Sequence, residues 1–111
     1  MNIKDNTNIS MIGYGSWATA LVSVLTENGK SVNWYIRNRE ILESVRTNGV
    51  NCKYLQDIDL KTDLICATDD INEAVRNGNL IFIAMPSAFL KEYFSSLDTE
   101  LDGKFLVSAV S

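Results

Sequence analysis

The sequence predicts an α/β fold in which helices cover both faces of a parallel, doubly wound sheet. Five short apolar segments alternate with segments of helical periodicity along the 111 residues, and this alternation is typical of parallel sheets. Residues 80–85 are apolar on both faces of the expected strand, as a central strand buried between two helical layers must be. The third observation is the turn Gly13-Tyr14-Gly15, which joins the first apolar segment directly to a helical one.

The first strand is expected at residues 9–12, and the helix that follows it opens near Ser16. Asn28-Gly29 should end this helix, because glycine readily adopts the left-handed conformation of a helix C-cap. The side chains expected to face the core recur at helical spacing: Trp17, Ala20, Leu21, Val24 and Leu25.

The second strand is expected at residues 31–36. A short helix should follow at residues 39–48 and end at Asn48-Gly49. A loop then runs from residue 50 to about residue 62, before a third strand at residues 64–68.

Asp70 should open the third helix, because Asp70 and Glu73 have the spacing of a capping box. Asn77-Gly78 should close it. Pro86 ends the fourth strand, and Ser87 is expected to cap the next helix. The apolar side chains of that helix are Leu90, Tyr93, Phe94 and Leu97. The last strand is expected at residues 105–110.

The strand, glycine turn and helix at residues 9–21 together predict a cradle for the pyrophosphate of a dinucleotide. Gly13 lets the chain turn sharply, Gly15 lets the backbone approach the pyrophosphate, and Ala18 lets the helix pack closely on the strand. The N–H groups of the helix that opens near Ser16 would face the phosphates. A bare Gly-x-Gly-x-x-Ala spacing is a weak signal, but the βαβ setting is the one that the motif requires. We therefore predict a Rossmann-type fold.

The residues after the second strand bear on the choice of cofactor. NAD-preferring folds place an acidic residue there, about 20 residues past the glycines, to bind the ribose 2′-hydroxyl. This chain has Arg37-Asn38-Arg39 instead, and arginines pair with a 2′-phosphate or stack on adenine. The pattern favours NADP(H), or tolerance of both NADP(H) and NAD(H). The alternative is that Arg37 and Arg39 are solvated loop residues.

Composition and charge exclude other classes. The chain is 46% hydrophobic, carries a net charge of −4 and contains no histidine, so neither nucleic acid nor an anionic membrane is an expected partner. No apolar run approaches the roughly 20 residues of a membrane span. The start of the chain lacks a signal-peptide hydrophobic region, so we expect the protein in the cytoplasm. Cys52 and Cys66 fall in no metal or redox spacing and are expected to be reduced, packed thiols.

Five segments carry a resemblance to a known family: residues 13–20, 33–38, 53–55, 67–70 and 83–87. With them the chain resembles the N-terminal domain of NAD(P)-dependent glycerol-3-phosphate dehydrogenase over nearly its whole length. The Gly-x-Gly-Ser-Trp-x-Thr-Ala block and Pro86-Ser87 are the most specific parts. The sequence of residues 33–37 is most similar to that of family members from Bacteroides-type bacteria.

The resemblance implies reversible hydride transfer between NAD(P)H and dihydroxyacetone phosphate, which gives sn-glycerol 3-phosphate for phospholipid synthesis. The cofactor-binding residues that it implies, together with the motifs above, are Gly13, Tyr14, Gly15, Ser16, Trp17, Arg37, Asn38, Pro86 and Phe89. Ser16 and Trp17 would lie against the pyrophosphate, and Pro86 and Phe89 beside the nicotinamide half. The alternatives are that Ser16 is only a helix N-cap, that Trp17 and Phe89 belong to the core, and that Tyr54 is a loop anchor.

The resemblance also implies that this chain, residues 1–111, is the front part of a longer, homodimeric enzyme. In the family a lysine that contacts substrate follows the fifth strand, where this chain has Ser111, and the catalytic lysine and substrate-phosphate contacts lie in a helical C-terminal domain. The chain alone is therefore expected to hold no catalytic residue, and at most to bind cofactor without turnover. Two alternatives are the cofactor domain of a 6-phosphogluconate or ketopantoate reductase type of dehydrogenase, and a non-catalytic nucleotide-sensing module.

Overall fold

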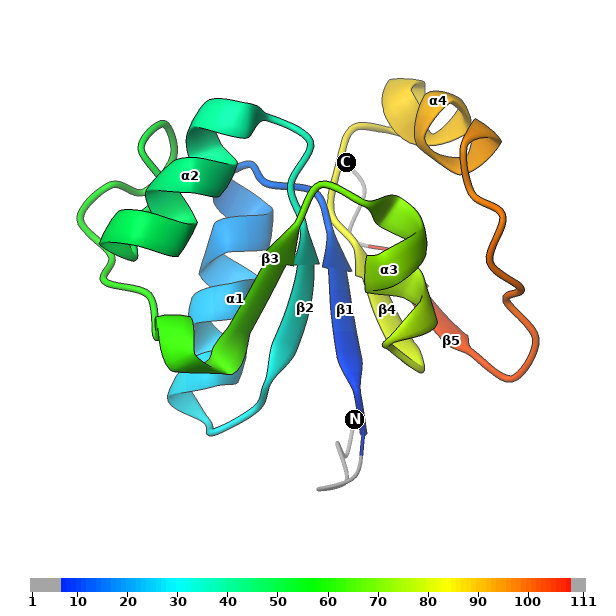
Figure 1. Ribbon diagram of the computed structural model, residues 1–111, viewed down its shortest axis with the longest axis horizontal. Coiled ribbons are helices and arrows are strands. Elements are labelled where there is room, and N and C mark those ends of the chain that lie inside the picture. The colour runs from blue at the N-terminus through cyan, green and yellow to red at the C-terminus, as the bar shows by residue number, and fades with distance from the viewer. Residues whose placement is uncertain (1–6, 109–111) are drawn as a thin grey trace.

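The computed structural model describes residues 7–108 as five parallel strands between two layers of helices (Figure 1). The strands are β1 (Ile9–Ile12), β2 (Val32–Tyr35), β3 (Ile65–Thr68), β4 (Leu80–Ile83) and β5 (Phe105–Ser108). Their order across the sheet is β3-β2-β1-β4-β5. The chain leaves β1 towards one side of the sheet and later crosses to the other, so the carboxyl ends of β1 and β4 form the switch point at which ligands bind in such sheets.

The helices are α1 (Ser16–Glu27), α2 (Arg39–Asn48), α3 (Ile71–Arg76) and α4 (Leu90–Ser95), with 3₁₀ turns η1 (Thr62–Leu64) and η2 (Ser87–Phe89). α1 and α2 cover one face of the sheet, and α3 and α4 the other (Figure 1). Successive strand residues point to opposite faces, so Met11 lies in the core beneath α1 and α2, and Ile12 in the core beneath α3 and α4. The predicted parallel, doubly wound α/β sheet is confirmed.

Local signals placed several helix ends correctly. Asn38 is the N-cap residue of α2 and its side chain accepts a hydrogen bond from the Ile41 N–H, while Gly49 ends the helix in the left-handed conformation. The Asp70 carboxylate accepts from two N–H groups in the first turn of α3, as predicted. The last helix differs, because α4 begins only at Leu90 and its N-cap residue is Phe89 rather than Ser87.

The predicted inner face of α1 is right only in part, because Leu21 and Leu25 pack against the core while two other members of the stripe are exposed. Trp17 is 59% and Val24 58% exposed, and the buried side chains of the helix are Ala18, Thr19, Val22 and Thr26. Two threonines can be buried because each hydroxyl donates to the carbonyl one turn earlier: Thr19 to Gly15 at 2.8 Å, and Thr26 to Val22 at 2.9 Å. The apolar periodicity missed these residues because it counts threonine as polar.

Two further expectations concern the edges of the sheet. Cys66 is exposed rather than packed, because it lies on β3, an edge strand of the sheet. The predicted last strand is observed from Phe105 to Ser108, and the rest of it, with Ser111, falls outside the described residues. Within residues 7–108, no helix combines the length and the apolar character needed to cross a membrane.

Gly13 is a position at which both the backbone conformation and the packing require glycine. Its φ is +123°, and a Cβ there would lie 2.2 Å from the Ala84 carbonyl oxygen. We predict that Gly13→Ala lowers the free energy of unfolding by at least about 2 kcal/mol, since both the backbone strain and the clash fall on a packed strand end. Urea denaturation followed by far-UV circular dichroism measures this change. Gly15→Ala is the matched control, because a Cβ at Gly15 meets nothing within 4 Å, and equal losses in both variants would contradict the prediction.

Candidate functional site

A cleft of about 360 Å³ opens at the switch point of the sheet. One wall is the turn Gly13-Tyr14-Gly15, which follows β1, and the other is formed by Met85, Pro86 and Phe89, which follow β4. Tyr54, from the loop before β3, and Tyr93, from α4, complete the lining. Five of the nine predicted site residues thus share one cleft: Gly13, Tyr14, Gly15, Pro86 and Phe89.

The two glycines of the turn have different surroundings. Gly13 packs against the backbone of Ala84 at the end of β4, so its missing side chain lets two strand ends approach each other. Gly15, by contrast, faces open space where a Cβ would stand. The absence of a side chain at Gly15 therefore leaves the backbone accessible from the cleft, as the close approach of a phosphate requires.

All three carbonyl groups of the turn are engaged by the protein itself. The Gly13 carbonyl accepts a hydrogen bond from Trp34 Nε1 at 2.6 Å, and the Tyr14 carbonyl accepts one from Asn51 Nδ2 at 2.9 Å. The Gly15 carbonyl accepts from both the backbone N–H and the hydroxyl of Thr19. These donors lie in or against the core, so the turn's lone pairs are held away from the cleft. The first N–H groups of α1, which lack partners within the helix, are left to meet a ligand.

Asn51 is a site residue that the sequence analysis missed. Its side chain is fully buried, and it donates to Tyr14 and to the Thr19 hydroxyl while its Oδ1 accepts from the N–H groups of Lys53 and Tyr54. Asn51 thus ties the loop before β3 to the glycine turn. Its local sequence marks a loop and nothing more, because its partners are 32 and 37 residues away.

The loop that Asn51 holds brings Tyr54 to the rim of the cleft, where the ring is 39% exposed. Phe89, on the opposite wall, is 50% exposed. The alternative that Phe89 belongs to the core is therefore wrong, whereas the expectation that Tyr54 is a loop anchor stays a prediction. Two exposed aromatic rings border the cleft.

Ser16 and Trp17 lie next to the turn, on the first turn of α1, and both are exposed. The N-cap residue of α1 is Gly15, so the alternative that Ser16 serves as the helix cap is wrong. The exposure of Trp17 likewise rules out the alternative that its indole is a core anchor. Both side chains stand at the end of α1 to which the helix dipole lends positive character.

Arg37 and Asn38 lie just after the carboxyl end of β2, and neither lines the cleft. Arg37 borders a neighbouring hollow of about 280 Å³ together with Tyr35, Glu92, Tyr93 and Ser96. Tyr93 lines both this hollow and the cleft, so the two spaces are adjacent. The Asn38 side chain is occupied in capping α2.

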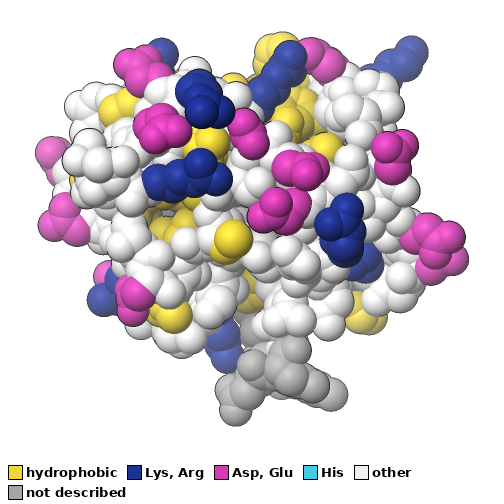
Figure 2. All heavy atoms as spheres, viewed as in Figure 1, with side chains coloured by type: hydrophobic (Ala, Val, Ile, Leu, Met, Phe, Trp, Pro, Cys, Tyr) yellow, Lys and Arg dark blue, Asp and Glu magenta, His cyan; other side chains and the backbone are white. Residues whose placement is uncertain are grey.

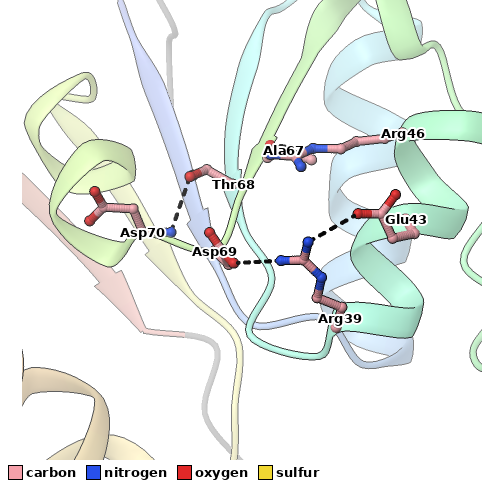
Figure 3. Close-up of polar contacts among 7 residues, drawn as sticks. All are labelled: Arg39, Glu43, Arg46, Ala67, Thr68, Asp69 and Asp70. Carbon is pink, nitrogen blue, oxygen red and sulfur yellow. Dashed lines mark hydrogen bonds and ion pairs between the residues drawn. The ribbon is translucent and has the colours of Figure 1, made fainter.

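Both arginines that follow β2 face carboxylates. Arg37 Nη1 lies 2.6 Å from Glu92 Oε1, and the guanidinium stands 5.7 Å from the centre of the Tyr93 ring. Figure 3 shows Arg39 between Asp69, at 3.4 Å, and Glu43, at 3.8 Å. Over the face drawn in Figure 2, basic and acidic side chains are interspersed rather than gathered by sign.

Burial raises the pKa of the Tyr93 hydroxyl to about 12, and its contact with Tyr14 acts in the same direction. Burial also raises the pKa of Tyr35, whose ring meets that of Tyr93 edge-on with centroids 5.5 Å apart. Both hydroxyls are therefore neutral hydrogen-bonding groups at physiological pH. The wall between the two hollows is aromatic and uncharged.

The fold and the cleft together define the structural class of this chain. A parallel sheet of this order, with a glycine turn opening onto α1 at the switch point, is a Rossmann-type domain. Residues 8–111 match the family described as the N-terminus of NAD-dependent glycerol-3-phosphate dehydrogenase. The chain belongs to this family.

Individual relatives agree with the family. The chain is 36% identical over 100 residues to the glycerol-3-phosphate dehydrogenase [NAD(P)+] of Ectopseudomonas mendocina, covering 90% of this chain and 29% of the relative. It is 36% identical over 102 residues to the enzyme of the same name from Limosilactobacillus reuteri, covering 89% and 30%. The structure of glycerol-3-phosphate dehydrogenase from Saccharomyces cerevisiae superposes with a TM-score of 0.84 at 26% identity, over 95% of this chain and 33% of that one. The chain spans about a third of these proteins.

Asn51 offers a test of how the turn is held. We predict that Asn51→Ala lowers the free energy of unfolding by about 2–3 kcal/mol, because it leaves buried donors and acceptors of Tyr14, Thr19 and the 53–54 backbone without partners. Thermal and urea unfolding measure the loss. Asn51→Asp is the matched comparison, since it keeps the acceptor for the two N–H groups and removes the donor to Tyr14 and Thr19. An alanine variant as stable as the parent would show that these bonds do not hold the turn.

The raised pKa of Tyr93 predicts a loss of stability in alkali. A folded pKa of about 12 against an ordinary value of 10 means that the folded state favours the protonated hydroxyl, so its contribution is complete below about pH 10 and is lost as the pH rises towards 12. Tyr93→Phe should remove up to about 2 kcal/mol of this pH dependence. Urea unfolding of both proteins across that range, with phenolate absorbance as a second readout, measures it. Parallel stability curves for the two proteins would contradict the prediction.

Proposed function

We propose that this chain is the cofactor-binding domain of a glycerol-3-phosphate dehydrogenase that uses NAD(H) or NADP(H). The observation that carries the proposal is the glycine turn whose three carbonyls are all engaged by Trp34, Asn51 and Thr19. Such a turn presents N–H groups to an anion, and the start of α1 adds a favourable dipole. The open space at Gly15 is where a pyrophosphate would approach the backbone.

Two adjacent hollows suit the two halves of a dinucleotide. In this proposal the pyrophosphate lies at the turn beside Ser16 and Trp17, and the nicotinamide half lies in the cleft against Pro86 and Phe89. The adenosine half would then occupy the hollow at the end of β2, with Arg37 beside its ribose and Asn38 fixing the backbone there. Tyr93 separates the two halves, because it lines both spaces.

The nicotinamide, when bound, supplies the hydride, and the described residues bind and orient it. Proton donation and binding of the substrate phosphate are assigned to the part of the protein that corresponds to the remaining two thirds of the relatives. We propose dihydroxyacetone phosphate and glycerol 3-phosphate as the substrate pair, and a homodimer as the assembly of the full-length protein. The names of the relatives and the family membership support the reaction.

The proposal is tested with the full-length protein that contains this chain. Saturable energy transfer from tryptophan to the nicotinamide of NADH or NADPH is expected, together with oxidation of the cofactor in the presence of dihydroxyacetone phosphate. Gly15→Ala places a Cβ where the pyrophosphate would approach and should weaken cofactor binding about tenfold, with a smaller loss of stability than Gly13→Ala because that Cβ meets no protein atom.

Ser23→Ala, two turns further along α1, is the binding control and should leave the affinity unchanged. A polypeptide of residues 1–111 should bind the cofactor without turnover if it folds alone. Absence of binding of either cofactor to a folded full-length protein would refute the proposal, and binding without reduction of dihydroxyacetone phosphate would refute the assigned reaction.

A further inference from the structure

The end of β2 carries an arginine where an NAD-preferring fold carries an acid, yet a carboxylate reaches this place from another element. Glu92, on α4, lies 2.6 Å from Arg37 Nη1 and hydrogen-bonds to it. The two residues are 55 positions apart in the chain. The carboxylate that the sequence lacks at the end of β2 is thus supplied by the tertiary structure.

The same holds for the second arginine. Arg39 lies between Asp69, at the end of β3, and Glu43, one turn along α2 (Figure 3). Each guanidinium that could meet a 2′-phosphate therefore already faces a carboxylate. Of the three ion pairs, Arg37–Glu92 is the closest, and both of its side chains are about half exposed, against 74% for Arg39.

We propose that Glu92 is a specificity-determining residue that makes this site prefer NAD(H) over NADP(H). The proposal rests on the proposed cofactor function and reverses the expectation drawn from the arginines alone. A 2′-phosphate must take Arg37 from Glu92 and then remain beside that carboxylate, which repels it. A ribose 2′-hydroxyl has no charge to repel, and it can donate a hydrogen bond to the carboxylate as it does in NAD-preferring folds.

The surroundings of the Arg37 side chain favour the position in which it pairs with Glu92. Its guanidinium stands over the Tyr93 ring at 5.7 Å, and the Tyr93 ring is itself fixed by its edge-on contact with Tyr35. Tyr93 and Glu92 are neighbours on α4, so one short helix supplies both the face and the anion that hold the guanidinium. Asp69 adds a further negative group on the β3 side, where it holds Arg39. A phosphate entering between β2 and α4 would meet carboxylates from two elements.

The test compares the dissociation constants of NADH and NADPH for the full-length protein and for Glu92→Gln, at one fixed ionic strength. The parent should bind NADH more tightly, and Glu92→Gln should shift the ratio of the two constants about fivefold towards NADPH. Glu27→Gln is the matched control. It makes the same change in net charge at the far end of α1, which precedes the amino end of β2, and should leave the ratio unchanged.

Each outcome bears on a distinct statement. An unchanged ratio in Glu92→Gln, with both cofactors binding, overturns the role of Glu92 and leaves the proposed function standing. A parent protein that binds NADPH more tightly than NADH overturns it equally. Failure of the folded parent to bind either cofactor removes the proposed function and this specificity together.

Discussion

The site depends on the hydrogen bonds that hold the carbonyls of the glycine turn towards the interior. The donors come from β2, from the loop before β3 and from α1 itself. Without these donors the turn would present lone pairs as well as N–H groups to the cleft, and lone pairs repel an anion. The polarity of the cradle is therefore a property of three segments that only the folded chain brings together.

The sheet order gives this turn its position. β1 is the central strand, paired on one side with β2 and on the other with β4, so the turn after β1 stands where the two halves of the sheet diverge. The close packing of Gly13 on Ala84 joins the ends of β1 and β4. The position of the turn therefore depends on the strand order and on the conformation of Gly13. The turn cannot move without disturbing the central strands.

The described residues end at a partly uncovered strand. Phe105 is 75% and Leu106 48% exposed on β5, which is an edge strand of the sheet. At the carboxyl end of β2, Glu92 and Asp69 pair with the two arginines that the sequence alone suggested were available for a phosphate. The charge of these arginines is balanced by carboxylates from other parts of the fold, namely α4 and the end of β3.

The sequence by itself determined the features that depend on neighbouring residues. Asp70 opened and Gly49 closed helices where expected, the glycine spacing placed the turn, and the run apolar on both faces marked a buried inner strand. The fold and one wall of the site followed from them. The tertiary structure decided what depends on distant partners: the burial of Thr19 in place of Trp17, the bridge made by Asn51, and the pairing of Arg37 with Glu92. The reason is physical, since capping and periodicity act within a few residues, whereas these contacts join segments that only packing makes adjacent.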